Sequence, residues 1–416
     1  MRAIFIGRFQ PFHKGHLKAI KWILKKEKKI SIVIGSLEKF LVKENPFSFQ
    51  ERKEMIKRTL LAEDIKNFEI YGVPDFFDDV FWAKKVLEIT KSKKNEVVVF
   101  SQNPWTKRCF QKIGTKIQNH PIYFNGLSAT KIRERMAENK KWENLVPKLV
   151  LDFLKKNKAE KKIKFLSILP EKKIVDFLEK KIKEAKAKGA IVGVSGGIDS
   201  SVTAFLVKKT LGKKAFFLNI LFIRTCPLQD NVSLLEKKIK TKIKRIFLDE
   251  IYKSFLKILP QGDKLTKGNL KSRLRMALLY YFANLNKLLV VGTSNKSELE
   301  IGYFTKFGDG GADILPLGDL YKTEVVEMVK RLKLPKKIIE TVPSANLWPG
   351  QTDEKEIGLD YQKLDIVLKL LAQNFKEKEI SFLTGISQKK IKDIIERKKE
   401  NFHKLSFPPI CRMKSF

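Results

Sequence analysis

Cysteine and histidine are scarce in this chain. Its 416 residues include three cysteines and four histidines. Cys109, Cys226 and Cys411 lie far apart and form no CxxC pair, so the sequence predicts neither a zinc site nor a disulfide framework. This cysteine usage fits a protein of a reducing cytosol.

Long apolar runs are also absent. The longest have the length of a strand, and lysine interrupts the others. The first residues enter a strand-like run at once, without the pattern of a signal peptide. We therefore expect a cytoplasmic protein with no membrane partner.

Acidic residues are few relative to basic ones: 46 Asp and Glu face 85 Lys and Arg, for a formal net charge of +39. Clustered basic residues would indicate nucleic acid, because they release counterions from phosphate backbones. Here the excess is mostly lysine, spread along helical segments such as residues 155–164 and 180–188, without an RNA-binding aromatic motif. We expect a solvated, lysine-biased surface and no nucleic-acid partner, with a polyanion-binding face as the alternative; either would attract anionic nucleotides.

Two α/β patterns follow one another along the chain. Short β-branched runs at residues 3–7, 30–35 and 97–100 alternate with amphipathic segments at 17–26 and 50–61, and after a lysine-rich helical stretch at 147–188 further strands are expected from 190, at 216–222 and at 288–292. Strands that alternate with helices predict parallel sheets. The predicted fold class is α/β, with two Rossmann-like, doubly wound parallel-sheet domains at residues 1–163 and 164–416.

The most specific motif is the sequence IVGVSGGIDSS at residues 191–201, where an apolar run leads directly into a glycine-rich turn. Glycines allow close approach to an anion, a new helix offers unpaired N–H groups, and Asp199 can hold the magnesium that accompanies a nucleotide. No Gly-Lys-Ser/Thr follows, so this is not a Walker loop. SGGxDS resembles the pyrophosphate loop of the ATP-pyrophosphatase, or adenine nucleotide α-hydrolase, type, which implies cleavage of ATP to AMP and pyrophosphate. A glycine-rich turn without a ligand is the alternative.

A second phosphate-binding pattern, GRFQPFHKGH, occupies residues 7–16 after the first expected strand. His13 and His16 are three apart at the expected start of a helix, where they would share a face beside the positive end of its dipole. Two imidazoles there can donate hydrogen bonds to the phosphates of a nucleoside triphosphate. HxGH after a strand resembles the nucleotidyltransferase superfamily, and the longer form is similar to archaeal-type nicotinamide-mononucleotide adenylyltransferase.

This first resemblance covers about residues 1–154. It is supported by Gly35-Ser36, Asn45-Pro46-Phe47 with Glu51-Arg52, Pro74-Asp75, and the sequences SQNP at 101–104 and SATKIR at 128–133. It implies ATP contacts from Gly7, Arg8, Phe9, Ser128 and Thr130, catalytic roles for His13, His16 and Arg133, and mononucleotide contacts from Trp82 and Asn103. The structural alternatives are a plain helix cap at Ser128 and a core tryptophan at Trp82.

The chain departs from that family at three places. Phe40-Leu41 stands where the family often has Ser-His, and Ala129 stands where it often has Gly. A basic residue that helps to hold ATP in some members falls at or beside Glu44, so either Lys43 replaces it or the contact is missing. These differences affect the expected binding contacts and leave the expected reaction unchanged.

The C-terminal half carries further polar motifs after strands that are expected to be buried. They are the sequences GNLKSRLRM at 268–276, VGTSNKSE at 291–298, GYFTKFGDGGAD at 302–313, PSANL at 343–347 and GQTDE at 350–354, with His403-Lys404 before Pro408-Pro409. Such polar density is costly unless a ligand uses it. Together these segments are similar to ammonia-dependent NAD synthetase over nearly all of residues 164–416.

The second resemblance implies a set of ligand contacts. The ATP contacts would be Gly193, Val194, Ser195, Gly196, Gly197, Ile198, Ser200, Thr293, Lys322 and Ser344; the magnesium ligands would be Asp199, which is also catalytic, and Glu298; and deamido-NAD would contact Arg273, Lys306, Asp313, His403 and Lys404. Phosphates and a nicotinate carboxylate call for cations, and magnesium calls for carboxylate oxygens. Taken singly, each of these charges could instead lie on a solvated helix face.

The two resemblances imply consecutive reactions. The first domain would transfer AMP from ATP to nicotinate or nicotinamide mononucleotide, and the second would amidate deamido-NAD to NAD with ATP and ammonia through an acyl adenylate. The expected cofactor is magnesium, and we expect a homo-oligomer. The sequence leaves no room for a separate glutaminase domain, so ammonia would be free or supplied by another protein.

Three other functions stay open. A pyrophosphate-loop enzyme that modifies tRNA, with a nucleotide-binding N-terminal domain, would call for an RNA-binding appendix or catalytic cysteines, and we find neither in the sequence. One half could be a degenerate scaffold that only binds nucleotide. The first half alone could transfer a cytidylyl group.

Overall fold

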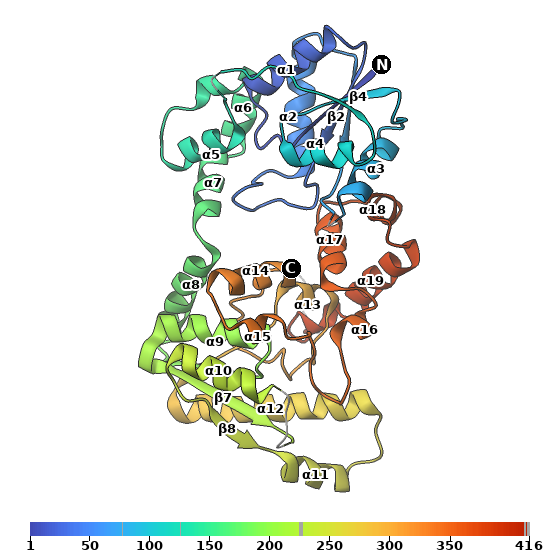
Figure 1. Cartoon of the computed structure of the whole chain (residues 1–416). Helices are drawn as coiled ribbons and strands as arrows, with labels where there is room; N and C mark the ends of the chain where they lie inside the picture. Colours follow the sequence, from blue (N-terminus) through green and yellow to red (C-terminus); the bar gives the residue numbers. More distant parts are fainter. Residues whose placement is uncertain (77, 125, 224–227, 412, 414–416) are drawn as a thin grey trace. The chain divides into compact units, whose positions relative to one another are not determined.

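The computed structural model describes residues 1–76, 78–124, 126–223, 228–411 and 413 (Figure 1). Cys226 therefore lies outside the described residues. The chain forms two compact units: unit 1 contains Met1–Ile168 and Lys369–Ile386, and unit 2 contains Leu169–Leu368 and Ser387–Phe416. The domain boundary expected after residue 163 falls inside helix α7, and the sequence alone does not indicate that residues 369–386 belong with unit 1.

Unit 1 is built on a five-stranded sheet in the order β3-β2-β1-β4-β5, with every neighbouring pair parallel. Its elements are β1 (Arg2–Gly7), α1 (Lys14–Leu24), β2 (Ile30–Ile34), α2 (Phe49–Ala62), β3 (Phe68–Gly72), α3 (Asp79–Ile89), β4 (Val97–Phe100), α4 (Pro104–Gln111), β5 (Lys116–Gln118), α5 (Ala129–Ala137), η1 (Glu143–Leu145), α6 (Lys148–Lys156), α7 (Ala159–Ser167) and α18 (Glu377–Thr384). The strand order reverses between β1 and β4, which opens a crevice at the carboxyl ends of these strands.

The local sequence explains these elements. Every residue of β2 is buried, as expected of a central parallel strand covered on both faces. Helix α1 buries Leu17, Ala19, Ile20 and Ile23, which recur at helical spacing. Helix α2 begins with a capping box, in which the Ser48 side chain accepts from the backbone of Glu51 and the Glu51 side chain accepts from the backbone of Ser48.

Unit 2 is built on a four-stranded parallel sheet in the order β8-β7-β6-β9. Its elements are α8 (Pro170–Glu184), β6 (Gly189–Gly193), α9 (Ile198–Leu211), η2 (Gly212–Lys214), β7 (Ala215–Leu221), α10 (Gln229–Ile239), β8 (Lys244–Phe247), α11 (Asp249–Ile258), α12 (Lys264–Asn286), β9 (Leu288–Val291), α13 (Lys296–Ile301), α14 (Lys322–Arg331), α15 (Lys336–Ile339), α16 (Asp353–Ile357), α17 (Tyr361–Leu371, whose last residues belong to unit 1), α19 (Gln388–Glu400) and η3 (Phe402–Lys404). The order reverses between β6 and β9, so the crevice of this sheet lies beside the end of β6.

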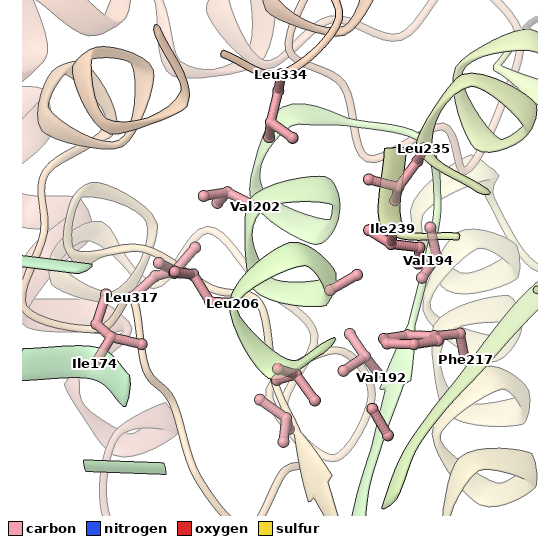
Figure 2. Close-up of a cluster of buried hydrophobic side chains, with 14 of the residues drawn as sticks. Ile174, Val192, Val194, Val202, Leu206, Phe217, Leu235, Ile239, Leu317 and Leu334 are labelled. Carbon is pink, nitrogen blue, oxygen red and sulfur yellow. The ribbon is translucent and has the colours of Figure 1, made fainter. Parts of the chain in front are cut away.

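The core of unit 2 surrounds helix α9. Figure 2 shows Val202 and Leu206 of this helix among side chains from β6, β7, α8 and α10. A second buried cluster, which includes Ile191, Ile220 and Val290, packs with residues of α12. Residues of β6, the strand that leads into the pyrophosphate loop, belong to both clusters, so the loop begins at the end of a buried strand.

The predicted α/β fold class with two parallel sheets is confirmed. The lysine-rich stretch at 147–188 is helical as expected and forms α6, α7 and α8. None of the described helices is long and apolar enough to cross a membrane.

Candidate active sites

The two N-terminal histidines lie where strand β1 gives way to helix α1. His13 is the N-cap residue: its Nδ1 accepts from the backbone N–H of His16 at 3.3 Å, and Nδ1 of His16 accepts from the backbone N–H of His13 at 3.2 Å. Their rings stack with centroids 3.5 Å apart. The expected shared face is confirmed, and the reciprocal capping is a role that we did not expect from the sequence.

Burial sets the protonation state of the two histidines, and these hydrogen bonds set their tautomers. Burial lowers the pKa of His13 to about 4, and burial, with the neighbouring His13 and His120, lowers the pKa of His16 well below its usual value. Both rings are therefore neutral near pH 7. Because each Nδ1 accepts a backbone N–H, the proton of each neutral ring sits on Nε2. The pair thus offers two Nε2–H donors without carrying charge.

His120 joins this pair and was not singled out in the sequence analysis. Its ring lies 5.4 Å from that of Phe5, which also contacts His16. It follows the short edge strand β5, and no motif marks it. Three of the four histidines of the chain therefore gather in unit 1.

Two arginines donate hydrogen bonds to the loops around the histidines. Arg133 donates from Nη1 to the carbonyl of Gln10 at 2.7 Å and from Nη2 to Oγ1 of Thr130 at 3.3 Å. Arg52, which is fully buried, donates to the carbonyls of Arg8, Gly35 and Ser36. Burial lowers the pKa of Arg52 to about 10, so it stays charged at neutral pH. Arg52 therefore joins the loop after β1 to the loop after β2.

The other residues expected in this site differ in exposure. Arg8 is exposed, and Phe9 is buried with its ring against Gly7, where any Cβ would meet it at 2.9 Å. Ser128 caps α5 and Asn103 caps α4. Trp82 is 1% exposed and packs against Trp105 and Phe110, so its predicted contact with the mononucleotide would require this ring to be uncovered.

In unit 2, the pyrophosphate loop connects β6 to α9 through hydroxyl contacts. The Oγ atoms of Ser195 and Ser200 are 3.0 Å apart, and Ser200 Oγ also accepts from the backbone N–H of Ser195. Gly196 has φ +90°, and a Cβ there would come within 2.7 Å of the Leu228 carbonyl, so only glycine fits. Gly197 is the N-cap of α9 and supplies no side-chain cap, which leaves the first N–H groups of the helix available to an anion.

Two buried asparagines hold this loop and were not predicted. Asn219 Nδ2 donates to the carbonyl of Val194 at 2.6 Å, and Asn231 Nδ2 donates to the carbonyl of Gly196 at 3.1 Å. They come from β7 and α10. Asn219 stands alone as a polar residue in the apolar run 216–222, a signal that could have marked it as buried, whereas Asn231 lies in a polar stretch that gives no such signal.

Three residues predicted to contact ATP or magnesium meet beside the loop. Asp199 accepts from the Lys322 ammonium and, at 3.1 Å, from Nδ2 of Asn295. Glu298 caps the backbone of Asn295 on α13. Burial, followed by the nearby Asp199 carboxylate, raises the pKa of Glu298 well above its usual value. Burial opposes the charge of Lys322, but Asp199 and Glu298 outweigh it and raise the pKa of that ammonium.

The donor chemistry of this cluster fits magnesium. Magnesium is usually held by one or two carboxylates together with substrate phosphates. Asp199 and Glu298 supply two carboxylates beside a loop suited to phosphate, and no described part of the chain gathers three or more His, Cys, Asp or Glu as a dedicated metal cage. Asp199 and Glu298 would therefore hold the ion together with the nucleotide.

Further acidic and phenolic groups extend this cluster. Asp353, which is 4% exposed, accepts from the hydroxyls of Tyr303 at 3.2 Å and Tyr361 at 2.9 Å. Burial raises the pKa of Asp353, and Asp199 adds to the effect. The segment GQTDE was expected to matter, but only the structure places its aspartate near Asp199 and Lys322.

Thr293 follows β9, the strand next to β6, in the stretch that leads to Asn295. Ser344 lies farther along the chain, and its hydroxyl donates to the Gln351 carbonyl within its own loop at 2.7 Å. Their predicted contacts with ATP stay predictions.

Four of the five residues expected to bind deamido-NAD come together in unit 2. Arg273 donates to the Lys306 carbonyl at 3.5 Å, and Lys306 donates to the His403 carbonyl at 2.6 Å. Lys404 donates to the carbonyls of Gly302 and Phe304. Asp313 instead accepts from Tyr280 and from the backbone of Val290. The chain end is thus tied to the loop at residues 302–313.

Asp309 on the same loop was not among the predicted site residues. Its carboxylate accepts from Ser272 Oγ at 2.7 Å and from the backbone of Thr305 at 3.0 Å. Burial lowers the pKa of Lys404, and the negative charge of Asp309 partly opposes this effect. Asp309 therefore places a carboxylate near Lys404.

Comparison with known proteins agrees with this geometry. The family described as NAD synthase matches residues 171–408. The chain belongs to the NAD synthase family. The N-terminal part matches the cytidylyltransferase-like family over residues 4–135. Both parts of the resemblance drawn from the motifs are confirmed at the level of these families.

Relatives named NH(3)-dependent NAD(+) synthetase match more than half of this chain. The NH(3)-dependent NAD(+) synthetase of Methanocaldococcus jannaschii is 44% identical over 243 residues, which are 57% of this chain and 94% of that protein. The Methanosarcina acetivorans protein of the same name is 40% identical over 58% of this chain and 96% of that protein. The solved structure of NMN synthetase from Francisella tularensis is 35% identical with a TM-score of 0.51, over 59% of this chain and 98% of that one.

Proposed function

We propose that this chain catalyses two consecutive steps of NAD synthesis: adenylylation of a pyridine mononucleotide in unit 1 and ammonia-dependent amidation in unit 2. The observation that carries the proposal is that each sheet has its own loop between its first strand and the next helix, with side chains suited to phosphate. In unit 1 the loop presents the His13 and His16 pair, and in unit 2 it presents Asp199 beside Lys322.

In unit 1, the phosphate of the mononucleotide would attack the α-phosphorus of ATP, and the bond to pyrophosphate would break. Charge grows on the phosphoryl oxygens during this transfer. The Nε2–H groups of His13 and His16 would donate to those oxygens, and Arg133 would add a cation within the same loop system. No covalent enzyme intermediate is needed, and the pair does not have to lose a proton.

In unit 2, the nicotinate carboxylate would attack the α-phosphorus of a second ATP, giving an acyl adenylate and pyrophosphate. Ammonia would then attack the carbonyl carbon, AMP would leave, and one proton would pass to solvent. Lys322 would neutralise charge on the phosphates, and the Arg273, Lys306 and Lys404 group would hold the anionic substrate. Magnesium held by Asp199 and Glu298 would supply further charge neutralisation on the phosphates.

A second candidate for unit 2 is the amidation of nicotinate mononucleotide, before adenylylation. The likeness to the Francisella tularensis NMN synthetase, at 35% identity over 59% of this chain, favours it. The chemistry at the carboxylate is the same in both cases. The order of the two steps would then be reversed, and nicotinamide mononucleotide would be the substrate of unit 1.

One time course tests both orders. The purified chain is given nicotinate mononucleotide, ATP and magnesium, first without and then with an ammonium salt, and the nucleotides are separated by chromatography. Accumulation of deamido-NAD before ammonium, and its conversion to NAD afterwards, supports the first order. Nicotinamide mononucleotide that forms before any dinucleotide supports the second. Absence of all dinucleotides would refute the proposed function, and NAD formation from glutamine alone would reveal a nitrogen-donating activity that the proposal lacks.

We also propose that the chain works as a homo-oligomer in the cytoplasm. Light scattering on the purified chain measures its mass against the 48.2 kDa of one copy. A monomer at assay concentration would refute the oligomer.

A further inference from the structure

Residues 369–386 lie within the part of the sequence that matches the NAD synthase family, yet they pack as part of unit 1. The chain leaves unit 2 near the end of α17 and returns to it after Ile386. Lys85 of α3 donates to the carbonyl of Phe382 at 2.8 Å, and its ammonium lies 4.9 Å from the centre of that ring. Unit 1 therefore includes a segment that its own family match does not contain.

Gln373 uses both ends of its side-chain amide in this contact. Nε2 donates to the carbonyl of Leu37 at 2.9 Å, and Oε1 accepts from the backbone N–H of Phe49 at 3.1 Å. The side chain is only 9% exposed. Phe49 is the first residue of α2, so its N–H has no partner within the helix. Gln373 satisfies a carbonyl and an N–H that would otherwise be buried without partners.

The backbone around Gln373 holds the amide in place. The N–H of Phe375 bonds to the carbonyl of Leu370, and the N–H of Asn374 bonds to that of Leu371, with Asn374 at φ 64°. This is the Schellman pattern that ends a helix, and it makes Gln373 the C-cap of α17. The ring of Phe375 then packs on Phe49 at 5.8 Å. The Schellman hydrogen bonds and the contact between Phe375 and Phe49 therefore fix the backbone on which the Gln373 amide lies.

Leu37, one of the two residues that Gln373 contacts, belongs to the loop at the carboxyl end of β2. The Gly35 N–H donates to the Gly7 carbonyl at 3.0 Å, and the Ser36 hydroxyl donates to Asp75 at 2.9 Å. The Arg52 guanidinium donates hydrogen bonds to the carbonyls of Gly35 and Ser36. This loop, residues 35–39, lies next to the end of β1, where the segment with the histidine pair begins, because β1 and β2 are neighbours and end at the same edge of the sheet.

We propose that Gln373 is a positioning residue for nucleotidyl transfer in unit 1, acting through the 35–39 loop and the first turn of α2. This inference rests on the proposed function of unit 1. Gln373, which lies in the segment matched by the NAD synthase family, would thus help to position a loop of the site in unit 1.

The test uses the full chain with Gln373→Met, which keeps the length of the side chain and removes both hydrogen bonds. Gln362→Met, on the exposed surface of the same helix, is the matched control. The substitution leaves a buried carbonyl and a buried N–H without hydrogen-bond partners, which costs free energy in the 35–39 loop and the first turn of α2. We therefore expect kcat/KM for adenylyl transfer to fall about tenfold or more in Gln373→Met, mainly because KM for the mononucleotide rises. Amidation of supplied deamido-NAD should match wild type in both variants.

Two further measurements separate positioning from simple stabilisation. Ser36→Ala alone and combined with Gln373→Met should show losses that do not multiply, because both act through one loop. Hydrogen exchange of the full chain should rise at residues 35–49 in Gln373→Met. A lower melting temperature with unchanged KM and kcat would overturn the proposal. If wild type makes no dinucleotide, the proposed function fails, and unchanged exchange at 35–49 would separately overturn the positioning role.

Discussion

Lys322 forms an ion pair with Asp199 across 123 positions of the sequence, and Lys322 is 4% exposed. The carboxylate that is expected to contact magnesium is therefore already paired with a buried cation. Lys322 is also the first residue of α14, where the backbone N–H has no acceptor within the helix and instead donates to the Ser297 hydroxyl. The pair places one negative and one positive group beside the pyrophosphate loop, and we propose that they contact magnesium and phosphate, respectively.

The two sites should fail independently. Asp199→Asn removes the charge and should lower amidation at least about a hundredfold, because a proposed magnesium ligand and the ion-pair partner of Lys322 are lost together. Adenylyl transfer should be unaffected. His16→Asn keeps an acceptor for the cap of α1 but removes the Nε2–H donor, and it should have the reverse effect by a similar factor. Each variant is the control for the other, and a folded single variant that loses both activities would contradict separate sites.

Unit 1 should lose stability as the pH falls from 6.5 toward 4. The folded pKa of His13 is about 4, below its unfolded value of about 6.5, so the unfolded chain binds the proton first. The stability is complete above pH 6.5 and declines below it, by up to about 3 kcal/mol from this residue. Four of the five tryptophans lie in unit 1 (Trp22, Trp82, Trp105 and Trp142), so fluorescence-detected denaturation reports mainly on this unit.

The matched variant is His13→Asn, because asparagine is a good N-cap and does not titrate in this range. The free energy of unfolding of wild type minus that of the variant should fall between pH 6.5 and 4. A difference that stays constant over this interval would show that His13 does not have the lowered pKa.

The chain end should be needed for amidation. Lys404→Met keeps the length of the side chain and removes the donor to the Gly302 and Phe304 carbonyls. We expect KM for deamido-NAD to rise about tenfold with adenylyl transfer unchanged, because a cation of the substrate group is lost. Lys399→Met, at the exposed end of α19, is the control. Equal kinetics for the two variants would remove the chain end from the site.

The sequence by itself determined the position of the two loops that are predicted to bind phosphate and the class of both sheets. This was possible because a strand, a glycine-rich turn and a helix start are contiguous in the chain, so local steric and hydrogen-bonding rules suffice. GRFQPFHKGH and SGGIDS each contain both the loop and the side chains that serve it. The pairing of Asp199 with Glu298 as magnesium ligands came from the family resemblance and from no local rule.

Only the tertiary structure decided which distant residues support those loops. Arg52, Asn219, Asn231 and Gln373 act through backbone carbonyls, and a hydrogen bond to a carbonyl leaves no pattern in the sequence around the donor. The burial of Trp82 and the approach of His120 to His16 likewise depend on packing between separate elements. The return of residues 369–386 to unit 1 depends on a side-chain amide that meets a carbonyl 336 positions away, a contact that local periodicity does not encode.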